Sequence, residues 1–103
     1  MRAAIVSPDN QVLVSTATVW EIAIKQAQGR LEFPLDRFEA IMREMGIEVL
    51  PILPAHAIAA ARLPRHHGDP FDRMLVAQAR LEGLVLATID ATIRRYDAVY
   101  LRT

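Results

Sequence analysis

The chain has 103 residues, 52% of them hydrophobic, which fits one folded domain and excludes an intrinsically disordered protein. Lys plus Arg and Asp plus Glu both number 12, so an overall basic field that coats nucleic acid is excluded. The absence of cysteine excludes disulfides and thiolate metal sites, and no apolar run is long enough to cross a membrane. We therefore expect a single domain over residues 1–103 in the cytoplasm.

Hydrophobic periodicity and turn residues predict an alternation of strands and helices. In chain order, we expect the end of a helix over 1–6, a turn over 7–10, a strand over 12–14, helices over 19–28 and 35–45, an edge strand over 47–52, helices over 54–63 and 70–82, a strand over 85–88, a helical turn over 93–96 and a last strand over 99–101. Such alternation favours a mostly parallel sheet with helices on both faces.

The stretch over residues 65–90 carries the clearest local pattern. Asp69 is suited to cap a helix, because its carboxylate accepts from the free N–H groups of the first turn. Pro70 suits the first helical position, and Gly83 provides the left-handed residue that ends a helix. The apolar run over 85–88 is typical of a buried strand, and Asp90 follows it.

Three carboxylates are expected at one edge of this sheet. Thr18 and Glu21 have capping-box spacing, which places Glu21 in the first turn of one helix. Asp72 lies in the first turn of another helix, the one that Asp69 caps. Asp90 follows a strand, and strand ends and helix starts share an edge in parallel α/β sheets. Carboxylates that converge there suit Mg²⁺ or Mn²⁺, which can align water with a phosphodiester. The structural alternative is that the acids simply stabilise helix starts and a turn.

Other side chains near this edge allow two interpretations each. The histidines at 66 and 67 with Asp69 offer a zinc site, but no second ligand pair at zinc spacing accompanies them, and a solvated loop fits better. Trp20 is more often a core residue than a base-stacking platform. Lys25 forms an i,i+4 pair with Glu21 or leans toward a substrate phosphate. Arg65 and Arg73 allow the same two interpretations: a solvated surface side chain or a contact to a substrate phosphate.

Four segments, VLVSTATVWEIAIK, GRLEF, LPRHHGDPFDRMLVAQA and LATIDATIRRY, resemble the PIN-domain ribonuclease toxins of type II toxin–antitoxin modules, the VapC-like group. The resemblance implies a three-layer α/β/α fold with strand order 3-2-1-4-5. It implies a Mg²⁺- or Mn²⁺-dependent endoribonuclease that dimerises, cleaves RNA and is inhibited by a cognate antitoxin. It assigns metal and catalytic roles to Glu21, Asp72 and Asp90, and makes Asp69 a cap that supports them. We add Ser15, Lys25 and Arg73 as candidates for the surrounding shell or for contact with substrate.

One departure from the family pattern concerns the first, central strand. Family members begin with an apolar strand ending in aspartate, which the chain as given does not contain. Three explanations are open: a misassigned start, a fragment, or a degenerate toxin. In the last case the alternative function is that of an inactive remnant that binds an antitoxin or a partner subunit. We expect the central slot either to be filled from outside these 103 residues or to close, with the strands over 12–14 and 85–88 collapsing together.

Overall fold

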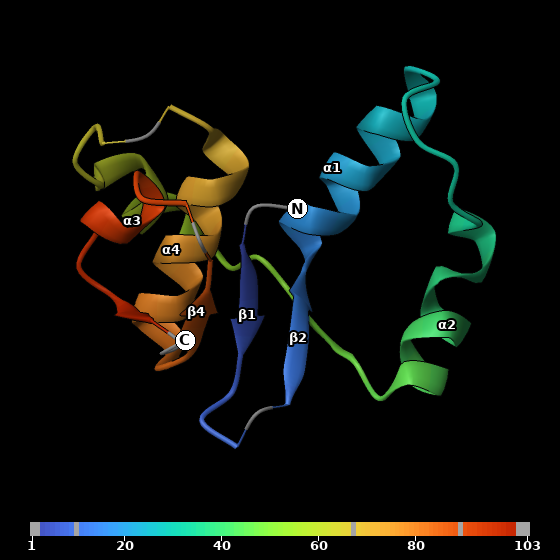
Figure 1. The fold of residues 1–103 in the computed structure, drawn as a ribbon, viewed down its shortest axis with the longest axis horizontal. Coiled ribbons are helices and arrows are strands. Elements are labelled where there is room, and N and C mark those ends of the chain that lie inside the picture. Colours follow the sequence, from blue (N-terminus) through green and yellow to red (C-terminus); the bar gives the residue numbers. More distant parts are fainter. Residues whose placement is uncertain (1–2, 10, 67, 89, 101–103) are drawn as a thin grey trace.

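A computed structural model describes residues 3–9, 11–66, 68–88 and 90–100. Five strands form one sheet that is flanked by helices, with β1 and β2 side by side between α3 and α4 on one side and α1 and α2 on the other (Figure 1). The elements are β1 (Ala4–Val6), β2 (Val12–Ser15), α1 (Thr16–Ala27), η1 (Leu35–Arg37), α2 (Phe38–Met45), β3 (Glu48–Leu50), α3 (Pro54–Arg62), α4 (Pro70–Glu82), β4 (Val85–Ala87), η2 (Ile93–Arg95) and β5 (Val99–Tyr100). None of the described helices is both long and apolar enough to span a membrane.

The strand order is β3-β2-β1-β4-β5, which confirms the expected order 3-2-1-4-5. The expectation for the central slot was wrong, however, because β1 fills it from within the chain. Residues 4–6 are a strand rather than the end of a helix, and this strand runs antiparallel to β2 and to β4. The other pairs, β2 with β3 and β4 with β5, are parallel. Four strands therefore share one direction, and the central strand alone opposes them.

Two rows of side chains cross the sheet, one on each face. The register places Leu13, Ile5, Leu86 and Tyr100 side by side, and this row packs into a core with apolar residues of α3, α4 and η2. The opposite face carries what we call the valine row, Val12, Val6, Val85 and Val99. Neighbouring residues in register point to the same face, so each row is a continuous apolar strip. The two ends of the valine row are exposed.

Helix α1 begins earlier than its sequence pattern suggests. Ser15, the last residue of β2, is its N-cap and accepts a hydrogen bond from the Ala17 backbone N–H at 3.0 Å. Thr18, the cap expected from sequence, lies inside the first turn and is buried. As a consequence, Glu21 lies in the second turn of α1, not in its first.

The helix expected after Asp69 is confirmed in detail. Asp69 has an extended backbone conformation, and its carboxylate accepts from the backbone N–H groups of Phe71 at 2.8 Å and Asp72 at 3.3 Å. Pro70 is the first helical residue, and Gly83 ends α4 with φ of 67°. These local contacts fix where α4 starts and ends, and they hold Asp72 in its first turn.

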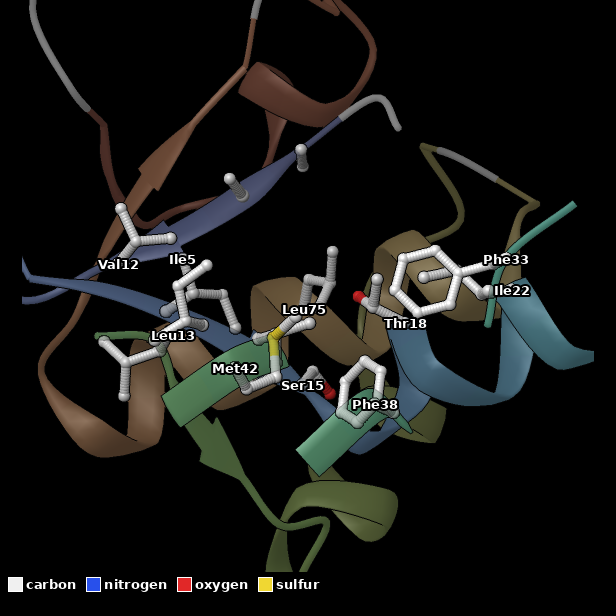
Figure 2. A pocket seen from close by; sticks show the side chains of 14 residues that line it. Ile5, Val12, Leu13, Ser15, Thr18, Ile22, Phe33, Phe38, Met42 and Leu75 are labelled. Atoms are coloured by element: carbon white, nitrogen blue, oxygen red, sulfur yellow. The ribbon is translucent and has the colours of Figure 1, made fainter. Parts of the chain in front are cut away.

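An apolar cleft of about 160 Å³ lies between the β1–β2 hairpin and the helices α1 and α2. Figure 2 shows Ile5 and Leu13 from the strands, Ile22 from α1, and Phe38 and Met42 from α2 around it. The cleft shows that α2 packs less closely on this part of the sheet than α4 does on the main core.

Candidate functional site at the sheet edge

We use the term rim for the edge of the sheet where β2 and β4 end and where α1 and α4 begin. The strands β2 and β4 share one direction, since both run antiparallel to β1. Helix α1 leaves the end of β2 at Ser15, and α4 returns to β4 through Gly83, so both helices start at this edge. Because β1 runs the opposite way, its first residues reach the rim, with Ala4 paired to Ala87 at the end of β4.

Asp72 is the most enclosed carboxylate of the rim. It lies in the first turn of α4 and is 5% exposed. The N-terminus of a helix favours a negative charge, because the peptide dipoles leave partial positive charge there. Asp69 next to it acts as the cap, which gives this second acid a structural role. The rim therefore holds one buried carboxylate in a favourable field, positioned by another.

Asp90 follows β4, as the sequence predicts, and organises the turn that leaves it. Its Oδ1 accepts from the backbone N–H of Thr92 at 2.8 Å and of Ile93 at 3.3 Å. Its own N–H donates to the Thr88 hydroxyl at 3.0 Å. These bonds orient the Asp90 carboxylate at the start of η2 and give it the turn-forming role weighed from sequence.

Glu21 pairs with Lys25 one helical turn further along α1. The Lys25 Nζ lies 3.5 Å from Glu21 Oε2, and the exposed side-chain fractions are 38% for Lys25 and 21% for Glu21. An ion pair this accessible to water contributes little stability. The structure thus shows the simpler interpretation of Lys25, the i,i+4 pair.

Arg73 holds the end of α3 against α4. Its guanidinium donates to the backbone carbonyls of Ala60 at 2.9 Å, Leu63 at 3.0 Å and Pro64 at 3.0 Å, and to the Tyr96 hydroxyl at 3.1 Å. The last carbonyls of a helix have no partner within the helix, so one arginine satisfies several of them. These contacts identify a structural role for Arg73.

The histidine pair expected in the loop before α4 is described only in part. The ring of His66 lies 5.1 Å from that of Tyr96, centroid to centroid, while residue 67 lies outside the described residues. Arg65 is exposed.

Within the described part of the chain, no group of three or more histidine, aspartate or glutamate side chains is placed to hold a metal ion. The carboxylates of Glu21, Asp72 and Asp90 therefore do not form the three-ligand set that the sequence suggested. Mg²⁺ usually keeps several waters and is held by one or two carboxylates together with substrate phosphates, so a smaller set of rim acids can still fit this ion. Two acids, Asp72 and Asp90, remain at the rim on adjoining elements.

The sequence matches the PIN domain model over residues 1–99. The chain belongs to the PIN domain family. PIN domains are generally nucleases and typically use divalent metal ions. Comparison with curated proteins and with solved structures gives no match. Membership of the family supports nuclease activity in general.

Two features of the rim were not found from sequence. Trp20, interpreted there as a core residue, is 62% exposed and lies edge-to-face against Phe71, with ring centroids 5.4 Å apart. The central strand also brings alanine, not aspartate, to the middle of the rim, since β1 begins at Ala4. Neither feature has a local sequence pattern, because each depends on how distant elements pack.

Proposed function

We propose that the chain is an endoribonuclease that hydrolyses RNA phosphodiesters with Mg²⁺ or Mn²⁺ and is the toxin of a toxin–antitoxin module. Family membership over residues 1–99 supports nuclease chemistry. The observation that carries the proposal is the buried carboxylate of Asp72 at the rim, in the first turn of a helix whose start is fixed by Asp69. Aspartate is almost never fully buried unless it is paired, so its burial makes Asp72 the carboxylate of the rim with the most closely defined surroundings.

The chain's own residues supply positioning in this proposal. Asp72 and Asp90 present carboxylate oxygens from α4 and from the turn after β4, and their backbone surroundings hold both in place. We assign Glu21 a supporting catalytic role on α1. Ser15 holds the start of α1, and Lys25 balances the charge of Glu21.

Cleavage of a labelled single-stranded RNA, with Mn²⁺ or with chelator, tests the proposal. We expect cleavage with Mn²⁺ that stops in chelator, and a strong loss of rate in Asp72→Asn and in Glu21→Gln. Asp97→Asn and Glu39→Gln are matched controls, because both residues are exposed and lie outside the proposed site. Cleavage by the Asp72 and Glu21 variants at the wild-type rate would remove both residues from the mechanism.

A second candidate function is an inactive PIN domain that binds an antitoxin or a partner subunit. The described residues favour it in one respect, since they do not gather three metal-binding side chains. A chain that cleaves no RNA at any Mn²⁺ concentration, yet forms a stoichiometric complex with the antitoxin, would support this function over the first.

We also propose that the protein acts in the cytoplasm as a homodimer controlled by a cognate antitoxin. The absence of cysteine suits a reducing compartment. The exposed ends of the valine row, Val12 and Val99, offer apolar contact area to a second chain. Sedimentation equilibrium of the wild type and of Val99→Lys tests the dimer, which this charge should weaken if the row is its interface.

A further inference from the structure

We propose that Trp20 and Phe71 form a stacking platform that binds an unpaired base of the nucleic-acid strand entering the rim. This inference rests on the proposed function, because it names how the same site holds its substrate. The two aromatic side chains lie on different helices and meet edge-to-face, with ring centroids 5.4 Å apart and ring planes at 70°.

The exposure of Trp20 is the first step of the argument. An indole 62% exposed on a helix leaves much of its apolar surface in water, which costs free energy that burial would recover. Other exposed apolar side chains in the described chain are aliphatic or methionine, so Trp20 stands out as the large aromatic ring among them. A flat, rigid, exposed ring is the type of surface on which a base stacks without regard to its identity.

The second step is the position of the pair beside the proposed catalytic acids. Phe71 immediately precedes the buried Asp72 in the first turn of α4, and Trp20 immediately precedes Glu21 in α1. The platform thus bridges the two helices that start at the rim. A base held there lies against the helical turns that carry Glu21 and Asp72.

The third step is the rigidity of the platform. Phe71 is half-buried, and its backbone N–H donates to the Asp69 carboxylate at 2.8 Å, so the start of α4 fixes the backbone that carries this ring. Its edge-to-face contact restrains the Trp20 ring in turn, a geometry that aromatic pairs prefer. A ring held in place before binding loses less conformational freedom when a base stacks on it.

Two cations lie on the segments that carry the platform. Lys25 lies one turn beyond Glu21 on α1, with 38% of its side chain exposed, and Arg65 is exposed in the loop that leads to α4. The net charge of the whole chain is zero, so cations close to the platform matter more than the overall field. In this proposal Lys25, on the same helix as Trp20, is the cation that contacts a phosphate next to the stacked base.

The chain contains a single tryptophan, so fluorescence excited at the long-wavelength edge, where its two tyrosines do not absorb, reports on Trp20 alone. The experiment titrates the wild-type protein with a short single-stranded RNA in chelator, where no cleavage is expected. Binding is measured by the anisotropy of a dye on the RNA, and stacking by quenching of Trp20. We expect saturable binding with quenching, and less quenching when the RNA carries abasic nucleotides.

Variants separate stacking from folding and from charge. Trp20→Ala should weaken RNA binding roughly 5- to 150-fold, while Trp20→Phe should keep most of the affinity, because each lost base stack has an effect of that size. Phe71→Leu should weaken binding less. Leu81→Ala is the matched control, since Leu81 is an exposed apolar residue of the same helix, about 15 Å along its axis from Phe71.

The outcomes distinguish this inference from the proposed function. RNA binding with quenching, but without cleavage in Mn²⁺, would support the platform and contradict the proposed function. Cleavage in Mn²⁺, with equal RNA affinity in the wild type and Trp20→Ala, would support the proposed function and contradict the platform. Absence of RNA binding by the wild type overturns the platform. Loss of dimerisation in Trp20→Ala, with RNA affinity unchanged, would also overturn it and place the ring in an interface between copies of the chain.

Discussion

The central position of β1 leads to a specific prediction for Ile5. Its side chain is 1% exposed and lies between Leu13 and Leu86 in the row that packs into the main core. Ile5→Ala removes three carbon atoms, which at about 0.8 kcal/mol each amounts to roughly 2.4 kcal/mol of lost burial. The cavity left behind adds to this, so we expect the free energy of unfolding to fall by about 2–5 kcal/mol.

The assay is urea unfolding followed by circular dichroism, with Val12→Ala as control. Val12 belongs to the same hairpin but is 44% exposed, so its truncation should cost no more than about 0.5–1 kcal/mol. Ile5→Val should fall between the two, at about 0.5–1.5 kcal/mol. If Ile5→Ala and Val12→Ala lower the unfolding free energy equally, with unchanged denaturant slopes, Ile5 is not in the core and the placement of β1 is wrong.

Three further predictions concern contacts that hold the rim. Asp69→Ala should lower the unfolding free energy by about 0.5–2 kcal/mol, while Asp69→Ser should recover most of it, because the cap bonds to Phe71 and Asp72 depend on a side-chain oxygen. Arg73→Leu should lower the thermal midpoint strongly and Arg73→Lys less, since the carbonyls of Ala60 and Leu63 then lose charged donors. Burial raises the pKa of Tyr100 above its usual value of 10.0, so the folded state binds this proton more tightly than the unfolded state. The contribution of Tyr100 to the free energy of unfolding should therefore be fully present below pH 10 and decrease above it. Unfolding of Tyr100→Phe measured across this pH range should not show that decrease.

Local chemistry made α4 predictable from the sequence. Its cap, its first residue and its terminating glycine are Asp69, Pro70 and Gly83, and each acts through bonds to its own neighbours in the chain. The start of α1 was less predictable, because Ser15 and Thr18 can both cap a helix. The structure uses Ser15, which ends β2 in register with Leu50 of β3, so the helix begins as soon as the strand pairing ends. The difference moves Glu21 by almost one turn away from the rim.

The exposure of Trp20 could not be predicted from hydrophobicity. A large aromatic residue in an apolar helical pattern is buried only if another element covers that part of the helix. In α1 the buried side chains are Ala17 and Thr18, both at its start. The sequence shows that a helix has an apolar stripe but not how far its neighbours extend along it, and the same limit concealed the apolar cleft beside α2.

The direction of β1 determines which residues meet at the middle of the rim. The turn after β1 is short: Ser7 N–H donates to the Gln11 carbonyl at 2.8 Å, and the Ser7 hydroxyl accepts from the Gln11 N–H at 3.0 Å. So short a connection requires β1 and β2 to be antiparallel, because parallel neighbours need a crossover of about a dozen residues or more. The end of β1 then lies at the far edge, and its start, Ala4, lies at the rim beside Ala87. The family pattern places an aspartate there at the end of a parallel strand, so the same slot in the same strand order presents alanine in place of a carboxylate. Within the described residues, the direction of β1 therefore places alanine rather than an acid at the middle of the rim, and the catalytic tests of Asp72 and Glu21 measure what the acids on α4 and α1 contribute.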